Sequence, residues 1–240
     1  MATSHLVLDI ETVLDAELPI VQTGDTERLP APPHHRVVVI GALLFEGHTY
    51  EVRRIGIVSE AKDEAGMLAD FAKLLEERRP NLVTFNGRGF DLPVIATRCL
   101  RHGITLRHYY RSSDVRYRFT SEGHLDLMDY IADFGAAKSA RLDVIAKLCG
   151  MPGKVGIEGK DVGPLVHAGR VDEVRNYCLC DVAQTAGVFL RLQLLRGELL
   201  RDAYLQAMRG LIAFIHADAR LSAVAAGLNE KRLLLEETSG

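Results

Sequence analysis

Long apolar runs are absent from this sequence. No stretch of about 18 or more residues is both apolar and free of charge, so no membrane-spanning helix is expected. The first four residues, 1–4, are followed by neither a basic flank nor a long apolar segment, so no secretory signal is expected either. Internal repeats and low-complexity linkers are also missing.

The sequence also has few cysteines and a small net charge. The four cysteines, Cys99, Cys149, Cys178 and Cys180, show no paired C-x-x-C spacing, which predicts buried free thiols rather than a zinc site. Free thiols fit a reducing compartment, so a cytoplasmic protein is expected. The formal net charge of −3 excludes a molecule that binds nucleic acid through an overall basic surface. Any such affinity must come from a local surface or from bound metal.

What the sequence does contain is enough apolar material for one large core, since 48% of its 240 residues are hydrophobic. Strands come first and a strand–helix unit follows them, which predicts an α/β fold with a mixed sheet and helices on both faces. Residues 13–35 are expected to form a proline-rich loop, 104–123 to be irregular, and 151–169 to form a glycine-rich loop. The predicted elements are a strand ending near residue 12, strands at 36–45, 50–58 and 81–85, and helices at 62–78, 92–102, 140–149 and from 171 onward.

The first apolar segment, residues 6–12, contains two carboxylates. Asp9 and Glu11 are two residues apart, so on a strand both side chains point to the same face. Residues 6–8 are apolar without alternation, which indicates a strand covered on both sides. Two carboxylates on a buried strand repel each other and are costly without a partner. A divalent cation such as Mg²⁺ or Mn²⁺ would relieve this repulsion, and the alternative is a strand end with two solvated acids.

Three residues later in the chain belong to the same pattern. Asp91 follows one predicted strand and precedes a helix, where taken alone it would be a helix cap. Tyr177 and Asp181 are four residues apart on the long predicted helix, so they share a face. The joint order singles these residues out: Asp-x-Glu, then Asn-x-x-x-Phe-Asp, then Tyr-x-x-x-Asp.

These segments, LDIET at 8–12, FNGRGFDLP at 85–93 and YCLCD at 177–181, resemble the three exonuclease motifs of family B DNA polymerases. They are similar to the tyrosine-type (DEDDy) branch of the DEDD superfamily of 3′–5′ exonucleases. Segments 124–127 and 141–146 also look like parts that these nucleases place between the second and third motifs. The resemblance spans residue 5 to about residue 190 and implies a ribonuclease H-like mixed five-stranded sheet with helices on both faces.

The chain has no room for a polymerase, so it resembles stand-alone bacterial relatives of the exonuclease domain. We expect residues 1–196 to form that domain and residues 197–240 to form a C-terminal helical extension packed on it.

The resemblance also implies roles for the motif residues. Asp9, Glu11, Asp91 and Asp181 would hold two Mg²⁺ or Mn²⁺ ions about 3.5–4 Å apart, one activating a water and the other stabilising the leaving oxygen. Tyr177 would orient the attacking water.

Substrate contacts are expected from the same motifs and from the segment 107–118. The predicted substrate-binding residues are Thr12, Asn86, Gly87, Phe90, Arg111, Arg116 and Arg118. Asn86 would bind the terminal nucleotide or brace its loop, and Gly87 would let the backbone of the strand approach. Phe90 would stack on a base or belong to the core. The arginines would contact phosphates, and the alternative for this segment is a solvated loop with its tyrosines packed beneath it.

The sequence thus favours a metal-dependent 3′–5′ exonuclease acting on the 3′ end of single-stranded DNA. One alternative is an exonuclease that trims RNA or oligonucleotides. That branch has histidine five residues before the last aspartate, where this chain has Asn176. Another alternative is a catalytically silent nucleic-acid-binding module, although all four acids are present. Asp126 and Asp143 would either support the metal ligands from behind or be structural, and a structural role is favoured for both.

Overall fold

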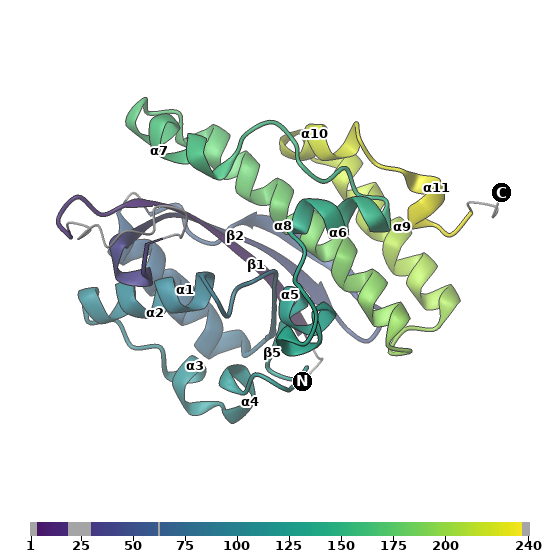
Figure 1. The fold of residues 1–240 in the computed structure, drawn as a ribbon, viewed down its shortest axis with the longest axis horizontal. Coiled ribbons are helices and arrows are strands. Elements are labelled where there is room, and N and C mark those ends of the chain that lie inside the picture. The colour runs from purple at the N-terminus through teal and green to yellow at the C-terminus, as the bar shows by residue number, and fades with distance from the viewer. Residues whose placement is uncertain (1–3, 19–29, 62, 237–240) are drawn as a thin grey trace.

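The structure is a computed structural model that describes residues 4–18, 30–61 and 63–236. One twisted five-stranded sheet runs through the molecule, with helices on both of its faces (Figure 1). Its strands lie in the order β3-β2-β1-β4-β5. Their bounds are β1 Ser4–Leu14, β2 His35–Glu46, β3 Glu51–Ile57, β4 Asn81–Thr84 and β5 His124–Asp126.

The directions of these strands make the sheet mixed. β1 pairs antiparallel with β2, and β2 pairs antiparallel with β3. β4 pairs parallel with β1, and β5 pairs parallel with β4. The predicted α/β, ribonuclease H-like fold with a mixed five-stranded sheet is therefore confirmed.

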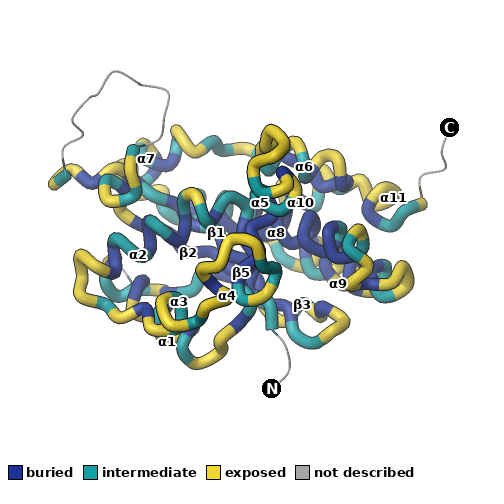
Figure 2. The backbone as a smooth tube through the Cα atoms, turned by 60° about the horizontal axis from the view of Figure 1, so that its bottom comes forward, coloured by how far each residue is buried: buried dark blue, intermediate teal, exposed yellow. Residues whose placement is uncertain are grey.

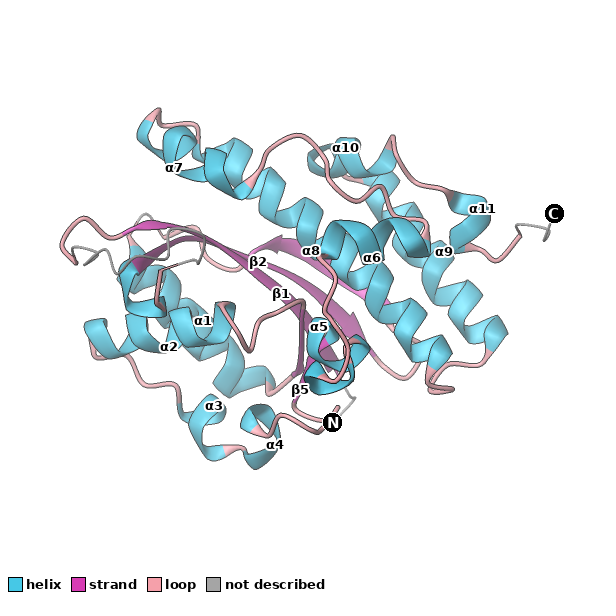
Figure 3. Ribbon diagram, viewed as in Figure 1, coloured by secondary structure: helices cyan, strands magenta, loops and turns pink. Residues whose placement is uncertain are grey.

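Eleven α-helices and three short 3-10 helices are found among the described residues. In order they are η1 Pro32–His34, α1 Glu64–Arg78, α2 Asp91–His102, α3 Arg107–Arg111, α4 Ser113–Arg116, α5 Leu127–Ile131, η2 Asp133–Gly135, α6 Leu142–Cys149, α7 Gly159–His167, α8 Val171–Leu195, α9 Arg201–Ala217, η3 Ala219–Leu221, α10 Ser222–Ala225 and α11 Glu230–Leu233. Helices α1 and α2 cover one face of the sheet, and α8 covers the other (Figure 3).

β1 lies at the centre of the sheet and is buried on both faces, as its apolar run predicts. Leu6 and Leu8 pack into the core that contains α1 and α2. Val7 points the other way, into the core around α8. The pleat of the strand places Asp9 and Glu11 on the same side as Val7, toward α8. Figure 2 shows this central part of the backbone as largely buried.

The helix α8 is the longest in the described part of the chain. By length and composition it could cross a membrane, although the sequence has no long charge-free apolar run. Within its most apolar window, however, 78% of the residues are buried inside the fold. Its apolar surface is used in packing against β1, β2, α6 and α9.

Residues 201–233 are mostly helical and pack on α8 through α9 and α10. Tyr204 joins these parts, because its hydroxyl accepts from Arg191 Nε at 2.9 Å and donates to the Leu233 carbonyl at 2.6 Å. The domain boundary at residue 196 stays a prediction.

Two of the predicted loops contain helices. Within residues 151–169, α7 forms because the Asp161 carboxylate accepts from the Glu158 N–H at 2.9 Å and because Val162 and Leu165 are buried. The glycines of this segment predict a loop, but tertiary packing overrides that weak local preference. Residues 104–123, predicted to be irregular, contain α3 and α4.

The predicted loop at 13–35 is also shorter than expected. β1 continues to Leu14, which pairs with His35 at the start of β2. Residues 19–29 of that loop lie outside the described residues.

A buried ion-pair cluster fixes α2, the helix that begins at Asp91, to the rest of the fold. Arg98 is 2% exposed and donates to both carboxylate oxygens of Glu64 in α1, at 2.8 and 2.6 Å. It also donates to Asp15, just after β1, at 2.6 Å. Removing the guanidinium would leave two buried carboxylates with weaker partners, Asp15 with Arg101 at 3.6 Å and Glu64 with the His102 imidazole at 2.8 Å.

We therefore expect Arg98→Ala to lower the free energy of unfolding by about 3–5 kcal/mol, as for other broken buried ion pairs. The matched control is Arg78→Ala in α1, because Arg78 is exposed and lies 3.7 Å from Glu46. That change should cost about 0–1 kcal/mol. Urea unfolding of both variants measures the difference, and equal midpoints would contradict the role given to Arg98.

Candidate active site

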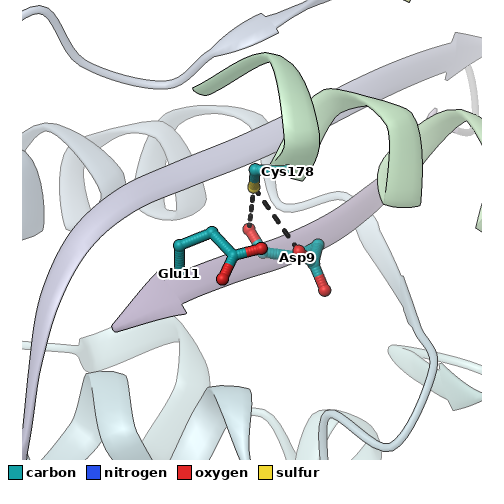
Figure 4. A group of neighbouring side chains, drawn as sticks. All are labelled: Asp9, Glu11 and Cys178. Atoms are coloured by element: carbon teal, nitrogen blue, oxygen red, sulfur yellow. Dashed lines mark hydrogen bonds between the residues drawn. The ribbon is translucent and has the colours of Figure 1, made fainter. Parts of the chain in front are cut away.

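Two carboxylates of β1 and a thiol of α8 form the centre of the site (Figure 4). Ligand atoms of Asp9, Glu11 and Cys178 all lie within 4.8 Å of one another. The Cys178 thiol donates weakly to Asp9, with Sγ 3.4 Å from Oδ2 and 3.5 Å from the backbone carbonyl. Gly41 of β2 makes room for it, because an added Cβ there would lie 2.7 Å from this sulfur.

Asp91 reaches the same place from the N-terminus of α2. Its Oδ1 accepts from the backbone N–H of Ile10, the residue between the two acids of β1, at 3.1 Å. The turn before Asp91 is held by Asp126, whose carboxylate accepts from the N–H groups of Asn86 and Arg88 at 2.9 and 2.8 Å. Asp126 also caps α5, so the structural role predicted for it is confirmed.

Asp181 completes the group from α8. Tyr177 lies one turn earlier on the same face, and its hydroxyl and the Asp181 carboxylate shift each other's pKa. Gln184, three residues later, donates to Asp181 Oδ1 at 3.3 Å. The Asp181 carboxylate is thus held by Gln184 on the face of α8 that also carries Tyr177.

The four carboxylates are in low-dielectric surroundings, and their charges affect one another's pKa values. Burial raises the pKa of Asp9 well above its usual range, and the charges of Asp91, Glu11 and Asp181 raise it further. The pKa of Glu11 is raised by burial and then by Asp181 and Asp91. Burial likewise raises the pKa of Asp91 to about 7 and that of Asp181 to about 6.

This donor set suits hard divalent cations. Carboxylate oxygens are the ligands that Mg²⁺ and Mn²⁺ prefer, and buried acids that repel one another are stabilised when a cation lies among them. The predicted metal ligands Asp9, Glu11, Asp91 and Asp181 are brought together from three elements, and their role as ligands stays a prediction.

Two neighbours of the acids were not predicted from the sequence as parts of the site. Cys178 is a free, buried thiol as expected, like the other three cysteines, but its contact with Asp9 was missed. Both residues could have been found, because Cys178 lies three residues before Asp181 and Gln184 lies three residues after it, and residues three apart on a helix are neighbours.

Two of the predicted nucleotide contacts, Thr12 and Phe90, lie against His35. The His35 Nε2 lies 3.0 Å from the Pro30 carbonyl and donates to it, so its Nδ1 accepts from the Thr12 hydroxyl at 3.0 Å. The Phe90 ring packs edge-on against His35, with 4.9 Å between centroids. A side chain does not fit at Gly87, because a Cβ there would lie 2.4 Å from Thr84 Oγ1. Packing within the protein is therefore enough to explain this glycine.

The segment 107–118 borders a separate cavity of about 550 Å³ that also includes Asn86. Arg118 is held by both oxygens of Asp129, at 2.8 and 2.7 Å. The Arg116 guanidinium lies over the Tyr110 ring, 5.0 Å from its centroid. Arg111 is exposed. Two of the three arginines predicted to bind phosphates are thus engaged within the chain, and a role in guiding the strand stays a prediction.

Most of this chain matches a known protein family. Residues 28–227 match a family described as a predicted 3′–5′ exonuclease related to the exonuclease domain of PolB. The chain belongs to this family. The match covers β2 to β5, α2 and α8, and therefore takes in Asp91, Tyr177 and Asp181.

Two individual proteins are similar to parts of this chain or to its fold. The family B DNA polymerase of the hyperthermophilic archaeon Pyrobaculum calidifontis superposes with a TM-score of 0.56 and 20% identity. The alignment covers 98% of this chain but 28% of the polymerase, and at this identity it shows the fold alone. The catalytic polypeptide of DNA polymerase epsilon from Schizosaccharomyces pombe is 29% identical over 79 residues, which are 31% of this chain and 4% of that protein.

The crowded acids of this exonuclease-family chain predict an unusual dependence of stability on pH. Because the pKa values of Asp91 and Asp181 are raised to about 7 and about 6, these two carboxyl groups bind more protons in the folded state than in the unfolded state above about pH 4. Burial lowers the pKa of His5 to about 4 and that of His124 to about 3, so these two histidines have the opposite effect below about pH 6.5, the pKa of an unfolded histidine. Above that pH the acids dominate, and the stability of the metal-free protein should fall as the pH rises. Thermal unfolding in EDTA between about pH 6.5 and 8 should therefore show a decreasing midpoint, and Mn²⁺ should restore it. A midpoint that rises or stays constant in EDTA would contradict the pKa shifts.

Proposed function

We propose that this chain is a divalent-cation-dependent 3′–5′ exonuclease that removes nucleotides from the 3′ end of single-stranded DNA. The observation that carries the proposal is the convergence of four acids from β1, α2 and α8 beside a tyrosine, in a chain of a predicted exonuclease family. A cytoplasmic location is part of the proposal and rests on the four buried free thiols.

Asp9 and Glu11 of β1, Asp91 of α2 and Asp181 of α8 would hold the cations. When bound there, Mg²⁺ or Mn²⁺ would lower the pKa of a coordinated water and neutralise charge that develops on the phosphate. The protein contributes the arrangement. The backbone of β1 fixes two ligands, the Ile10 N–H orients Asp91, and Gln184 orients Asp181.

Tyr177 would position the attacking water rather than take its proton. Burial and the neighbouring charges of Asp181, Glu11 and Asp9 raise the pKa of its hydroxyl far above neutral pH. The phenol therefore stays protonated and can donate and accept hydrogen bonds, but it is a poor general base. The rigid α8 holds the hydroxyl one turn from Asp181.

The terminal nucleotide would lie beside the turn 86–90 and the end of β1. Thr12 and Phe90 are brought together there by His35, and Asn86 opens onto the cavity that contains Tyr109 and Arg116. An aromatic ring next to a guanidinium suits unpaired bases, which stack on both kinds of group. Preference for DNA is proposed because both similar proteins are DNA polymerases by name and because position 176 is Asn.

A time course on 5′-labelled single-stranded DNA tests this proposal. With Mn²⁺, the labelled strand should shorten progressively from its 3′ end, and EDTA should stop the reaction. A parallel RNA strand of the same sequence should be shortened more slowly. Release of the label as a mononucleotide while the remaining strands are still full length, or no cleavage with either cation, would contradict the proposal. Faster cleavage of RNA would contradict the DNA preference.

A further inference from the structure

A series of aromatic side chains lies on the segments that flank β5, the strand at one edge of the sheet (Figure 1). The exposed aromatic residues of the described part of the chain are Tyr110 and two members of this series, Tyr117 and Phe119, which are 58% and 60% exposed. Neighbouring rings of the series meet edge to face. Their centroids are 5.9 Å apart for Tyr117 and Phe119, 5.0 Å for Phe119 and Phe134, and 5.7 Å for Phe134 and Tyr130. Tyr117, Phe119, Phe134 and Tyr130 are called the aromatic platform below.

The backbone at Phe134 is strained. Asp133 and Phe134 are consecutive non-glycine residues with positive φ, 49° and 54°. This left-handed conformation is unfavourable for residues that carry a Cβ, and it persists only where the surrounding structure favours it. Such strain is concentrated at sites that bind ligands. Here the strained turn places the Phe134 ring between Phe119 and Tyr130, in a series whose outer rings remain exposed to solvent.

The platform adjoins the cavity of about 550 Å³ beside the proposed active site. Arg118, which lies between two platform residues in the chain, lines this cavity. The same guanidinium lies beside the turn after Phe134, because a Cβ added at Gly135 would be 3.8 Å from its Nη2. Asn86, in the turn before Asp91, lines the cavity too. The cavity therefore connects the platform to the proposed active site.

The groups around the platform suit unpaired bases. The Arg116 guanidinium lies over the Tyr110 ring and the Arg196 guanidinium over the Tyr130 ring, each 5.0 Å from the centroid. Nucleobases of every kind stack on aromatic rings and on guanidinium planes. The segment 107–119 has four arginines and one aspartate in a chain of net charge −3, so the positive charge that attracts a phosphate backbone is local. A single strand of nucleic acid matches this combination of rings and charge.

We infer that the aromatic platform stacks the unpaired bases that precede the 3′-terminal nucleotide of the substrate strand. The strand would run from the acids through the cavity and onto the exposed rings of Tyr117 and Phe119. Bases in a duplex are already stacked and paired, so the platform selects single strands, and it does so without regard to sequence. This inference rests on the proposed function and assigns the binding to base faces rather than to phosphates.

Binding of fluorescein-labelled single-stranded DNA, followed by anisotropy, tests the inference on the full chain. Ca²⁺ replaces Mn²⁺, which keeps the charge of the cation while loosening its coordination. Phe119→Ala should weaken binding by about 5–150-fold, the effect of losing one contact between a base and an aromatic ring. The slope of log K against log salt should not change, because the ring carries no charge. Phe119→Tyr keeps a flat ring and should bind like the parent.

The matched control is Leu200→Ala, because Leu200 is 79% exposed and lies at the start of α9, outside the platform. It removes an exposed apolar side chain and should bind like the parent. Thermal unfolding of each variant verifies that the fold is intact.

A strand without bases separates stacking from contacts with phosphates. All bases except the two at the 3′ end are replaced by tetrahydrofuran, so the number of phosphates is unchanged. The parent should bind this strand less tightly than ordinary DNA, and Phe119→Ala should bind it as tightly as the parent does. The inference is overturned if Phe119→Ala binds ordinary DNA like the parent, or if it loses the same factor in affinity for both strands.

Cleavage with Mn²⁺ distinguishes this inference from the proposed function. If the parent shortens DNA while Phe119→Ala binds DNA like the parent, only the platform is wrong. If the parent binds DNA through Phe119 and never shortens it, the proposed function fails, while the platform remains a surface that binds single strands.

Discussion

Asp9→Asn is expected to lower the rate of DNA cleavage by more than about 10³-fold and, at the same time, to stabilise the metal-free protein. Asp9 is the acid whose pKa responds to all three of the others, so it lies at the centre of the cluster. Loss of a single electrostatic contact in an active site costs about 10²–10³-fold. Asp9→Asn should exceed this because it weakens cation binding itself.

The gain in stability has a separate cause. An amide at position 9 carries no charge, so it no longer repels Glu11, Asp91 and Asp181. It keeps an oxygen that can accept from the Cys178 thiol. Single-turnover cleavage with Mn²⁺ and thermal unfolding in EDTA measure the two effects on the same preparation.

The control for this change is Asp202→Asn, which alters an exposed aspartate in the first turn of α9. It should leave the cleavage rate unchanged. If Asp9→Asn cleaves at the parental rate, or if the metal-free variant is less stable than the parent, the acids of this site do not form a repelling, cation-binding group.

Tyr177→Phe should lower cleavage by about 10²–10⁴-fold while sparing folding, cation binding and affinity for DNA. The ring and its packing remain, and only the hydroxyl, whose pKa the Asp181 charge raises, is lost. A group that orients the nucleophile acts mainly in the transition state, so its loss appears in the single-turnover rate rather than in binding. Anisotropy with labelled DNA and calorimetric titration with Mn²⁺ measure the two affinities.

Tyr204→Phe is the matched control, because the Tyr204 hydroxyl is buried and bonded to the Leu233 carbonyl far along the chain. Its loss should cost roughly 1 kcal/mol of stability and leave cleavage unchanged. If Tyr177→Phe cleaves DNA at the parental rate, Tyr177 is a packing residue. The tyrosine-type mechanism would then have no basis.

The sheet could be predicted because its signals are local. The apolar run of β1 indicates burial on both faces, and the β-branched pattern near residues 36–45 indicates β2. The three motifs supplied the candidate acids, and the structure brings Asp9, Asp91 and Asp181 together from β1, α2 and α8. Two residues of one motif, such as Asp9 and Glu11, lie together as soon as the secondary structure of that motif is predicted correctly.

Contacts between distant segments could not be predicted in this way. Arg98 meets Asp15 across 83 positions, and Asp126 holds the turn at Asn86 across 40. Neither pairing leaves a pattern in the local sequence. The helix α7 was missed for a related reason, since the burial of Val162 against the sheet outweighs the glycines that suggested a loop.

Anomalous scattering from Mn²⁺-soaked crystals tests the central claim most directly, because it locates cations without depending on activity. We predict anomalous peaks between the carboxylates of Asp9 and Asp181, with Glu11 and Asp91 beside them, and loss of those peaks in Asp9→Asn crystals. A map without peaks at these four carboxylates, or with peaks only at exposed acids elsewhere, would contradict the cation site on which the proposed nuclease mechanism depends.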